Sequence, residues 1–317
     1  MIFHFDIVKG SRMTQEKAYQ IIELRSSIIG KDTRIKRALP TAKKRLIGAW
    51  CFLDHIGPTV FEKGGGLDIA PHPHTGLQTF TWMIAGKLTH TDSLGYKQVI
   101  EPEQVNLMTA GFGISHTEVT PADYAGPMHA VQLWIAQPEG CEPGEREGES
   151  NFEHYPEIPT KMEDGCEYRV LVGEFSSFVS PVRVATSLLG VDIRAPLQGT
   201  QVTLPLKKKF EHGLMLLKGE AVVDGQVMDE DHLIYWPAGQ SELRLELKAG
   251  AHVLLIGGEP FEAPVIIWWN LVVRGQEEIE EAVRQWKSQD GRFGVVADYP
   301  GKPLMPPEIP GKLVASR

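Results

Sequence analysis

Two histidines two positions apart are the first residues in this sequence whose types and spacing could do chemistry. His72 and His74 lie in the run PHPH, and side chains two positions apart on a β-strand point to the same face. Further along the chain, His116 and Glu118 repeat this spacing with an imidazole and a carboxylate. Two such strands facing each other across a barrel would bring three imidazoles and one carboxylate together. This donor set suits a first-row divalent metal ion and leaves coordination positions open for water, substrate or dioxygen.

Each of these histidines also has an ordinary structural explanation. A single histidine in a β-rich protein is more often a hydrogen-bonded core residue than a ligand, and the HxH spacing alone is common. The second pair favours the metal site, because the glycines and proline between the two pairs would turn the chain back to the same face. A core or surface hydrogen-bonding role is more typical of four other nearby residues, with support of the ligands as the alternative: His55, His90, Asp92 and His129.

The segments that must position these residues are typical of short β-strands. Between Leu46 and Gln137, apolar or alternating stretches recur between Gly, Pro and Asp residues, and similar stretches return between Tyr168 and Ile256. Residues 138–166 are rich in Glu, Pro and Gly and are expected to connect the two regions. The pattern predicts two all-β units joined by this connection.

The two ends of the chain differ from this pattern. Residues 14–29 have apolar positions compatible with a helix and are expected to form part of an N-terminal appendage. In QEEIEEAVRQWK, residues 276–287, Ile279, Val283 and Trp286 recur at spacings of four and three, with acids first and bases last, which predicts a short amphipathic helix. The Pro-rich tail from Tyr299 onward is expected to be extended.

Length and charge limit the classes of function. A chain of 317 residues exceeds what one core usually fills, since a domain typically takes roughly 100–200 residues. The formal net charge of -9 argues against direct nucleic-acid binding, which draws affinity from clustered cations. One basic stretch, residues 34–45, is expected to be a solvated face rather than a binding patch.

The cysteines and the apolar runs indicate the cellular compartment in which the protein is expected. Cys51, Cys141 and Cys166 lack both CxxC spacing and the density of a disulfide scaffold, which favours a reducing cytoplasm. No apolar run approaches roughly 18 residues, and the N-terminus lacks a cleavage-like pattern. Membrane spanning and secretion are therefore disfavoured.

Three runs of the sequence resemble the pirin family of the cupin superfamily. These are PHPHTGLQTFTWMIAG, HTDSLG and LMTAGFGISHTE, and the similarity extends over about residues 37–138, including FLDHIGP and QLWIAQP. The resemblance implies an all-β bicupin, that is, two cupin-type β-barrels, with a short C-terminal helix. The expected divisions are an appendage at 1–32, a metal-binding barrel at 33–150, a metal-free barrel at 151–275, and a helix and tail at 276–317.

The same resemblance implies a ligand set and an activity. The family's three His and one Glu ligands fall on His72, His74, His116 and Glu118. They imply one divalent metal ion, Fe(II) first, with Mn, Ni, Cu or Zn as alternatives, and a quercetin 2,3-dioxygenase activity on a flavonol and O2. Glu118 would also accept the substrate proton as the catalytic residue. The alternatives are a metal- or redox-responsive regulator with a protein partner, and a cupin that modifies another small molecule.

Three comparisons refine these expectations. The general cupin motif has Glu where this chain has Gln78, a position that pirins do not use as a ligand. Many pirins have Arg where this chain has Thr75, which predicts altered access at the mouth of the site. Aligning Gly219 with Gly86 places Pro205 and Lys207 where His72 and His74 stand, so the second barrel is expected to hold no metal.

Overall fold

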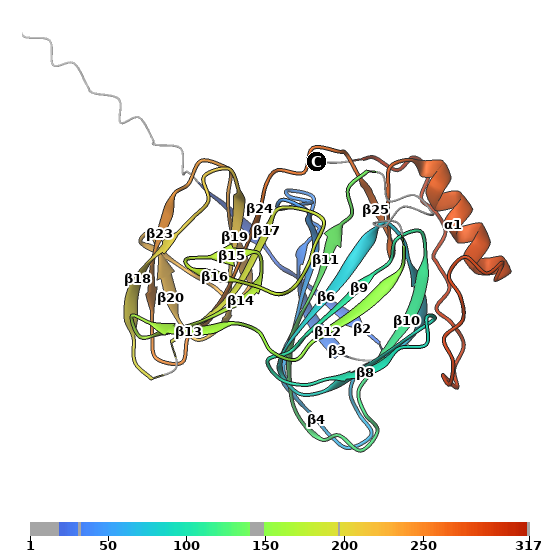
Figure 1. The fold of residues 1–317 in the computed structure, drawn as a ribbon, viewed down its shortest axis with the longest axis horizontal. Coiled ribbons are helices and arrows are strands. Elements are labelled where there is room, and N and C mark those ends of the chain that lie inside the picture. Colours follow the sequence, from blue (N-terminus) through green and yellow to red (C-terminus); the bar gives the residue numbers. More distant parts are fainter. Residues whose placement is uncertain (1–18, 31–32, 140–148, 196, 316–317) are drawn as a thin grey trace, which may run out of the picture.

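The chain folds into two β-barrels that lie side by side, as Figure 1 shows. The structure, a computed structural model, describes residues 19–30, 33–139, 149–195 and 197–315. In this part of the chain there is one α-helix, α1 (Gln276–Ser288), which confirms the helix expected at 276–287. The predicted all-β architecture with two units and a short C-terminal helix is confirmed.

In the first barrel, a seven-stranded sheet faces a four-stranded sheet. The larger sheet contains, in spatial order, β12 (Asn151–Tyr155), β9 (Val105–Thr109), β6 (Leu77–Ala85), β11 (Gly126–Ala136), β4 (Trp50–Phe61), β3 (Thr33–Leu39) and β2 (Arg25–Ile29). The smaller sheet contains β5 (Asp68–His74), β10 (Ile114–Val119), β7 (Leu88–Asp92) and β8 (Lys97–Ile100).

The second barrel repeats this plan with another seven-stranded and another four-stranded sheet. The larger sheet contains β1 (Gln20–Glu23), β22 (His232–Trp236), β19 (Glu211–Lys218), β24 (His252–Gly258), β17 (Leu188–Arg194), β14 (Cys166–Val172) and β13 (Thr160–Glu163). The smaller sheet contains β18 (Thr200–Pro205), β23 (Glu242–Leu247), β20 (Ala221–Val223) and β21 (Gln226–Val227). A two-stranded hairpin, β15 (Glu174–Phe175) and β16 (Phe178–Val179), lies outside these sheets.

The N-terminal segment joins the two barrels. β1 pairs with β22 in the second barrel, and the adjacent β2 pairs with β3 in the first. The helix expected for residues 14–29 is therefore wrong over residues 20–29; residues 14–18 lie outside the described part of the chain. The apolar positions of this segment fit the period of a helix and that of a strand. Pairing with distant strands stabilises the extended form.

The connection between the barrels begins later than expected. β12 pairs with β9, so residues 151–155 belong to the first barrel rather than to the second. β13 pairs with β14 at the edge of the second barrel's larger sheet. Residues 140–148 of the expected connection lie outside the described residues.

After the second barrel, the chain returns to the first. The hairpin of β25 (Ile266–Trp268) and β26 (Leu271–Val273) and the helix α1 pack at the outer side of the first barrel (Figure 1). The hairpin approaches the end of β5 so closely that a Cβ atom at Gly76 would lie 2.0 Å from the carbonyl oxygen of Val272. In the tail, Leu304 donates its backbone N–H to Pro71, on β5 (2.8 Å).

One apolar core continues from barrel to barrel. A single cluster of buried side chains contains Trp50 and Phe80 from the first barrel and Leu171 and Leu254 from the second. The Trp50 indole N–H lies within hydrogen-bond distance of the carbonyl oxygens of Leu189 and Gly257 (3.2 and 3.1 Å). Burial of this shared surface holds the barrels together.

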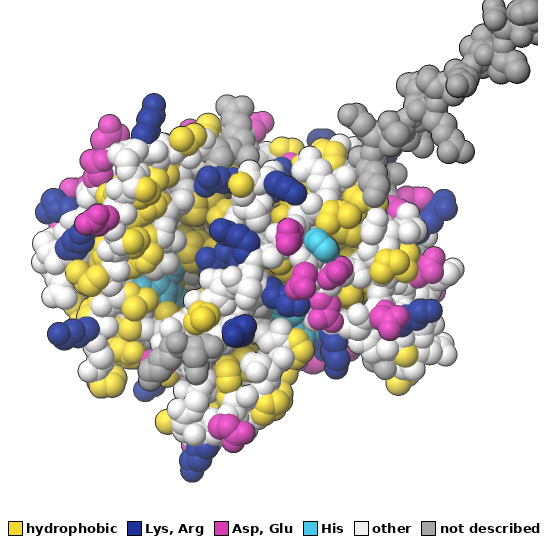
Figure 2. All heavy atoms as spheres, turned by 180° about the vertical axis from the view of Figure 1, so that it is seen from behind, with side chains coloured by type: hydrophobic (Ala, Val, Ile, Leu, Met, Phe, Trp, Pro, Cys, Tyr) yellow, Lys and Arg dark blue, Asp and Glu magenta, His cyan; other side chains and the backbone are white. Residues whose placement is uncertain are grey.

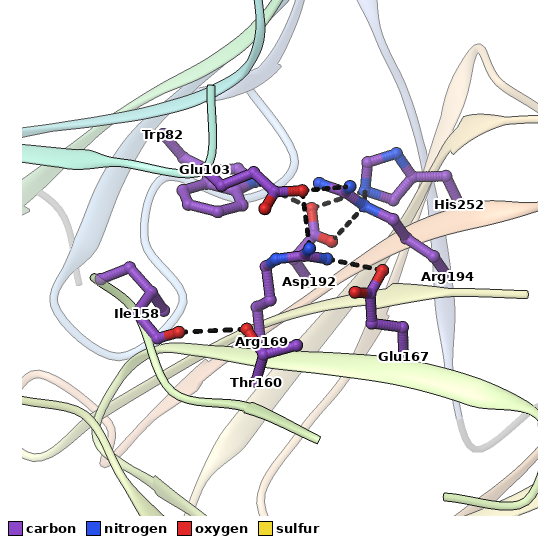
Figure 3. A network of polar contacts seen from close by, with 9 residues as sticks. All are labelled: Trp82, Glu103, Ile158, Thr160, Glu167, Arg169, Asp192, Arg194 and His252. Carbon is purple, nitrogen blue, oxygen red and sulfur yellow. Dashed lines mark hydrogen bonds and ion pairs between the residues drawn. The ribbon is translucent and has the colours of Figure 1, made fainter. Parts of the chain in front are cut away.

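A polar network flanks this core, as Figure 3 shows. Asp192 accepts hydrogen bonds from the Trp82 indole (2.8 Å), from Arg194 (2.8 Å) and from the His252 ring (2.5 Å). Glu103, from the first barrel, forms an ion pair with Arg169 of the second (2.6 Å). The buried carboxylate of Asp192 thus has donors from both barrels.

The basic stretch at residues 34–45 also contributes to this contact. Lys36 pairs with Asp231 (2.9 Å), and Lys44 pairs with Glu211 (2.6 Å), both across the two barrels. The expectation of a solvated face is wrong for Lys44, whose side chain is largely buried with Glu211, whereas Lys36 and Asp231 stay partly exposed.

No helix in the described ranges is long and apolar enough to cross a membrane. Cys51 and Cys166 are free and buried, and Cys141 lies outside the described residues.

Candidate metal centre

Three histidine rings converge inside the first barrel. β5 and β10 are antiparallel neighbours, and His116 lies directly opposite His72 in their register. The His116 ring centroid is 4.5 Å from that of His72 and 5.0 Å from that of His74. One nitrogen from each ring lies within 4.8 Å of the other two. The expectation that the two strands face each other across the barrel is wrong, because they are neighbours in one sheet. Three of the four residues expected as ligands nevertheless converge.

Hydrogen bonds at the far side of two rings fix which nitrogen faces the centre. His72 Nδ1 lies 2.9 Å from the carbonyl oxygen of Ala70, and His74 Nδ1 lies 2.9 Å from that of Asn270. A carbonyl oxygen only accepts, so both Nδ1 atoms carry the proton and both Nε2 atoms keep a lone pair. His74 Nε2 is 3.1 Å from His116 Nε2. A cation shared between these nitrogens matches their lone pairs, so the residues fit a bound metal ion.

Burial keeps the three rings neutral. It lowers the pKa of His72 to about 4, and it holds the pKa of His74 and of His116 well below the usual range, with His72 adding to the effect in both. A neutral imidazole is the form that binds a metal ion. The site is therefore able to bind a cation at neutral pH without first losing protons from charged rings.

Glu118 lies in the same cavity but outside the set of three converging rings. The partner strand is irregular at this point: His116 faces His72 on β5 whereas Glu118 faces Ile69, so β5 carries one extra residue opposite them. Burial raises the pKa of the Glu118 carboxyl to about 7, with a hydrogen bond from Thr81 acting in the opposite direction. The fourth expected ligand is thus placed beside the cluster, with a carboxyl group that exchanges protons near neutral pH.

The three rings and Glu118 line a cavity of ≈ 460 Å³. Figure 2, which views the molecule from behind, shows histidine side chains at the bottom of a depression among hydrophobic side chains. A larger, open depression of ≈ 810 Å³ on the second barrel has neither histidine nor cysteine among the residues that line it. The smaller cavity is therefore distinguished by its imidazole donors.

Stacked rings form one wall of the cavity. Phe52 and Trp134 stack with centroids 4.0 Å apart and planes 13° apart, and the Trp134 indole meets the His74 ring edge-on at 5.1 Å. The guanidinium of Arg37 covers the other face of this stack, 4.5 Å from the Phe52 centroid, and is paired with Asp54 by two contacts of 2.7 Å. Arg37 comes from the basic stretch, where its spacing does not mark it as a residue of the site.

Segments far from the motifs complete the cavity. Arg25 comes from β2, Trp269 and Asn270 from the β25–β26 turn, and Leu304 from the tail. Asn270 also supplies the carbonyl oxygen that holds His74. Nothing local in the sequence marks these residues, because docking of the C-terminal segment on the first barrel places them.

The two departures from the family pattern lie away from the cavity. Thr75 follows His74 on the opposite side of the chain and lines a separate groove, where its hydroxyl bonds the carbonyl oxygen of Phe112 (2.8 Å) and receives Arg292 (3.1 Å). The expectation that Thr75 alters the mouth of the site is therefore wrong. Gln78 donates to Thr109 (2.9 Å) and is not part of the cavity lining.

The four nearby polar residues separate into two pairs. His90 contacts both the His116 ring and Asp92, so this pair lies directly behind the cluster. His55 and His129 contact each other, Nε2 to Nε2 at 2.7 Å, and neither lines the cavity.

The interior of the second barrel is apolar. A cluster of buried side chains, including Val191, Leu214, Leu243 and Leu255, fills it. β18 takes the place of β5 and ends at Pro205, and Lys207 beyond it is exposed and paired with Glu174. That this barrel holds no metal stays a prediction.

Two barrels of one topology, with three convergent histidines in one of them, define a bicupin with a cluster that could hold a metal ion. Comparison with known families agrees: the pirin model matches residues 32–135, and the model described as the pirin C-terminal cupin domain matches residues 191–294. The chain belongs to the pirin family.

Known proteins match this chain over 76–95% of its length. A protein of Pseudomonas aeruginosa named "Putative quercetin 2,3-dioxygenase" is 44% identical over 300 residues, covering 95% of this chain and 93% of its own. The crystal structure of a quercetin 2,3-dioxygenase from Acinetobacter baumannii is 52% identical, with a TM-score of 0.91 over 94% of this chain and 98% of that one. A bacterial pirin from Escherichia coli in complex with nickel(II) shares the fold, with a TM-score of 0.58 at 17% identity over 76% of this chain and 99% of that one.

Proposed function

We propose that this protein is a metal-dependent dioxygenase that cleaves the ring of a flavonol such as quercetin with O2. The observation that carries the proposal is the convergence of three buried, neutral imidazoles in a cavity of ≈ 460 Å³. The quercetin 2,3-dioxygenase names of two similar proteins support the substrate class.

His72, His74 and His116 would hold the ion, with Glu118 as the fourth ligand. We propose Fe(II), with Mn, Ni, Cu or Zn as alternatives, because imidazole and carboxylate donors accept all of these metals. When bound, the ion would polarise a substrate hydroxyl as a Lewis acid and provide a place for O2 to react.

Glu118 would accept the proton of the substrate hydroxyl. Burial raises the pKa of its carboxyl to about 7 in the absence of a metal ion, and a bound cation would lower this pKa and keep the group ionised. An ionised carboxylate beside a hydroxyl that the ion polarises could accept its proton. The carboxyl group lies in the same cavity as the three rings. One side chain could therefore deprotonate the substrate at the place where the oxygen must be anionic.

The rest of the cavity suits a flat aromatic molecule. Trp134, Trp269 and Ile267 line the cavity with apolar surface. Arg25 and Arg37 line it with two positive charges, and Asp54 and Glu118 line it with two carboxyl groups. Arg37 is paired with Asp54, which leaves Arg25 as the cation that could face an anionic substrate oxygen.

Metal analysis of anaerobically purified protein, followed by oxygen uptake with a panel of flavonols on the same sample, tests this function. We expect bound metal, oxygen uptake with at least one flavonol, and loss of both in His74→Ala. Full activity in a metal-free variant would contradict the proposal. No oxygen uptake, together with a partner captured only in the presence of metal, would favour the regulatory alternative.

We also propose a cytoplasmic location, supported by the free thiols of Cys51 and Cys166. The net charge of -9 supports a small-molecule substrate over a nucleic-acid partner.

A further inference from the structure

His116 differs from the other two histidines of the cluster in what its Nδ1 atom meets. The Nδ1 atoms of His72 and His74 face backbone carbonyl oxygens, which can only accept a proton. His116 Nδ1 instead faces another imidazole nitrogen, Nδ1 of His90, at 3.2 Å. An imidazole nitrogen can donate or accept, so the state of His90 decides which nitrogen of His116 faces the metal.

Asp92 determines the state of His90. His90 Nε2 lies 2.9 Å from Asp92 Oδ2, and a carboxylate oxygen only accepts, so His90 Nε2 carries a proton. The other oxygen, Oδ1, accepts the backbone N–H groups of Leu94 (2.9 Å) and Tyr96 (3.1 Å). These bonds hold the orientation of the Asp92 carboxylate. They therefore keep the His90 proton on Nε2, directed at Oδ2.

Packing holds the His90 ring in this orientation. Its ring stacks on Phe152 with centroids 4.3 Å apart and planes 14° apart. His90 and Asp92 are both buried, and they lie on β7 next to β10, with Asp92 directly opposite His116. The ring therefore has little freedom to turn its Nδ1 atom away from His116.

We propose that Asp92 and His90 form a positioning pair that selects Nε2 of His116 as a metal ligand. Asp92 accepts a hydrogen bond from the Nε2–H group of neutral His90, so His90 Nδ1 keeps its lone pair. His116 donates its Nδ1 proton to that lone pair and presents its own Nε2 lone pair to the ion. This inference rests on the proposed metal site and adds residues that hold no metal themselves.

Two substitutions of His90 separate this role from a purely structural one. Asparagine places a side-chain oxygen near the former Nδ1 position and can still accept from His116, whereas glutamine places its polar atoms near the former Nε2 position. In metal-stripped protein titrated with Co²⁺, we expect His90→Gln to weaken binding about 10- to 100-fold and His90→Asn to weaken it less than about 3-fold. Unchanged binding in His90→Gln, or equal losses in both variants, would overturn the proposal.

Asp92→Asn tests the first step of the pair. The amide would donate to His90 Nε2 and move the His90 proton to Nδ1, where it would oppose the N–H of His116. We expect Co²⁺ binding to weaken about 10-fold or more; binding equal to that of the unmodified protein would contradict the proposal. Because Co²⁺ binding is measured without substrate, this result does not depend on whether flavonols are cleaved.

One measurement needs no variant and so avoids misfolding. In the Zn²⁺-loaded protein with ¹⁵N-labelled histidine, a hydrogen bond between two ring nitrogens gives a ¹⁵N–¹⁵N coupling across it. We expect this coupling between Nδ1 of His116 and Nδ1 of His90, with the proton attached to His116. A spectrum that shows the His116 Nδ1 proton without this coupling would overturn the proposal.

Discussion

A buried histidine serves as a metal ligand only while one ring nitrogen keeps a free lone pair. In this site, burial lowers the pKa values of His72, His74 and His116, so the rings are neutral, and carbonyl oxygens fix the proton of two of them on Nδ1. The two-residue spacing predicted these side chains because alternation is a property of a single strand. It could not predict the extra residue of β5 opposite His116 and Glu118, since this irregularity depends on how the two strands pair.

Glu118→Gln tests the proposed proton acceptor. The amide keeps an oxygen that can face the ion but cannot take a proton at neutral pH, so flavonol turnover should fall about 10²- to 10⁴-fold. Metal content should fall much less. Steady-state oxygen uptake and metal analysis of the same sample measure both, and turnover equal to that of the unmodified protein would show that Glu118 is not the acceptor.

Pairing between distant elements determines features of the fold and of the cavity that local sequence patterns do not predict. The strands and α1 were predicted because each has its own local period, whereas residues 20–29 fit a helix and a strand equally and became β1 and β2 through their partners β22 and β3. Asn270, whose carbonyl oxygen holds the His74 ring, lies 196 residues further along the chain. Arg37 lines the cavity, but its local sequence does not distinguish it from the basic residues around it. Such contacts depend on docking rather than on spacing.

The contact between β4 and β11 predicts a pH dependence of stability. Burial lowers the pKa of His55 to about 3 and that of His129 to about 4. The His129 ring adds to the lowering for His55, and the His252 ring adds to it for His129. Because these values lie below the ordinary value of about 6.5, the unfolded chain binds more protons between pH 6.5 and the folded pKa. The stabilisation is complete above about pH 6.5 and is lost as the pH falls toward the folded pKa.

From pH 7 to pH 5, we expect each of these two histidines to lower the free energy of unfolding by about 2 kcal/mol. Denaturant titrations of metal-free protein at both pH values measure the change, and the variant with both His55→Gln and His129→Gln is the control. The control should lose less stability over this interval. The same loss in both proteins would exclude this pair as the cause.

The two barrels of the molecule are connected by chain segments at both ends and by a shared core. β1 from the N-terminal segment completes the second barrel's sheet, and the C-terminal hairpin, helix and tail pack on the first. The continuous core around Trp50 and the buried Asp192 network join the barrels between these ends. The chain that leaves the second barrel thus returns to close the cavity of the candidate metal site with its hairpin and tail.

This coupling predicts one unfolding transition that responds to metal. Zn²⁺ at 100 times its dissociation constant should raise the free energy of unfolding by about 2.7 kcal/mol. Tryptophan fluorescence and far-UV circular dichroism should shift together. Two separate transitions, with only one shifted by Zn²⁺, would mean that the barrels unfold independently.

The most direct test of the account is metal content measured on four proteins purified in parallel. These are the unmodified chain, His74→Ala, His116→Ala, and His232→Ala as a control on a histidine outside the cavity. We expect about one divalent ion per chain in the first and last proteins and almost none in the two site variants, because each variant removes one of three convergent donors. Equal metal content in all four would contradict the assignment of these histidines as the metal site.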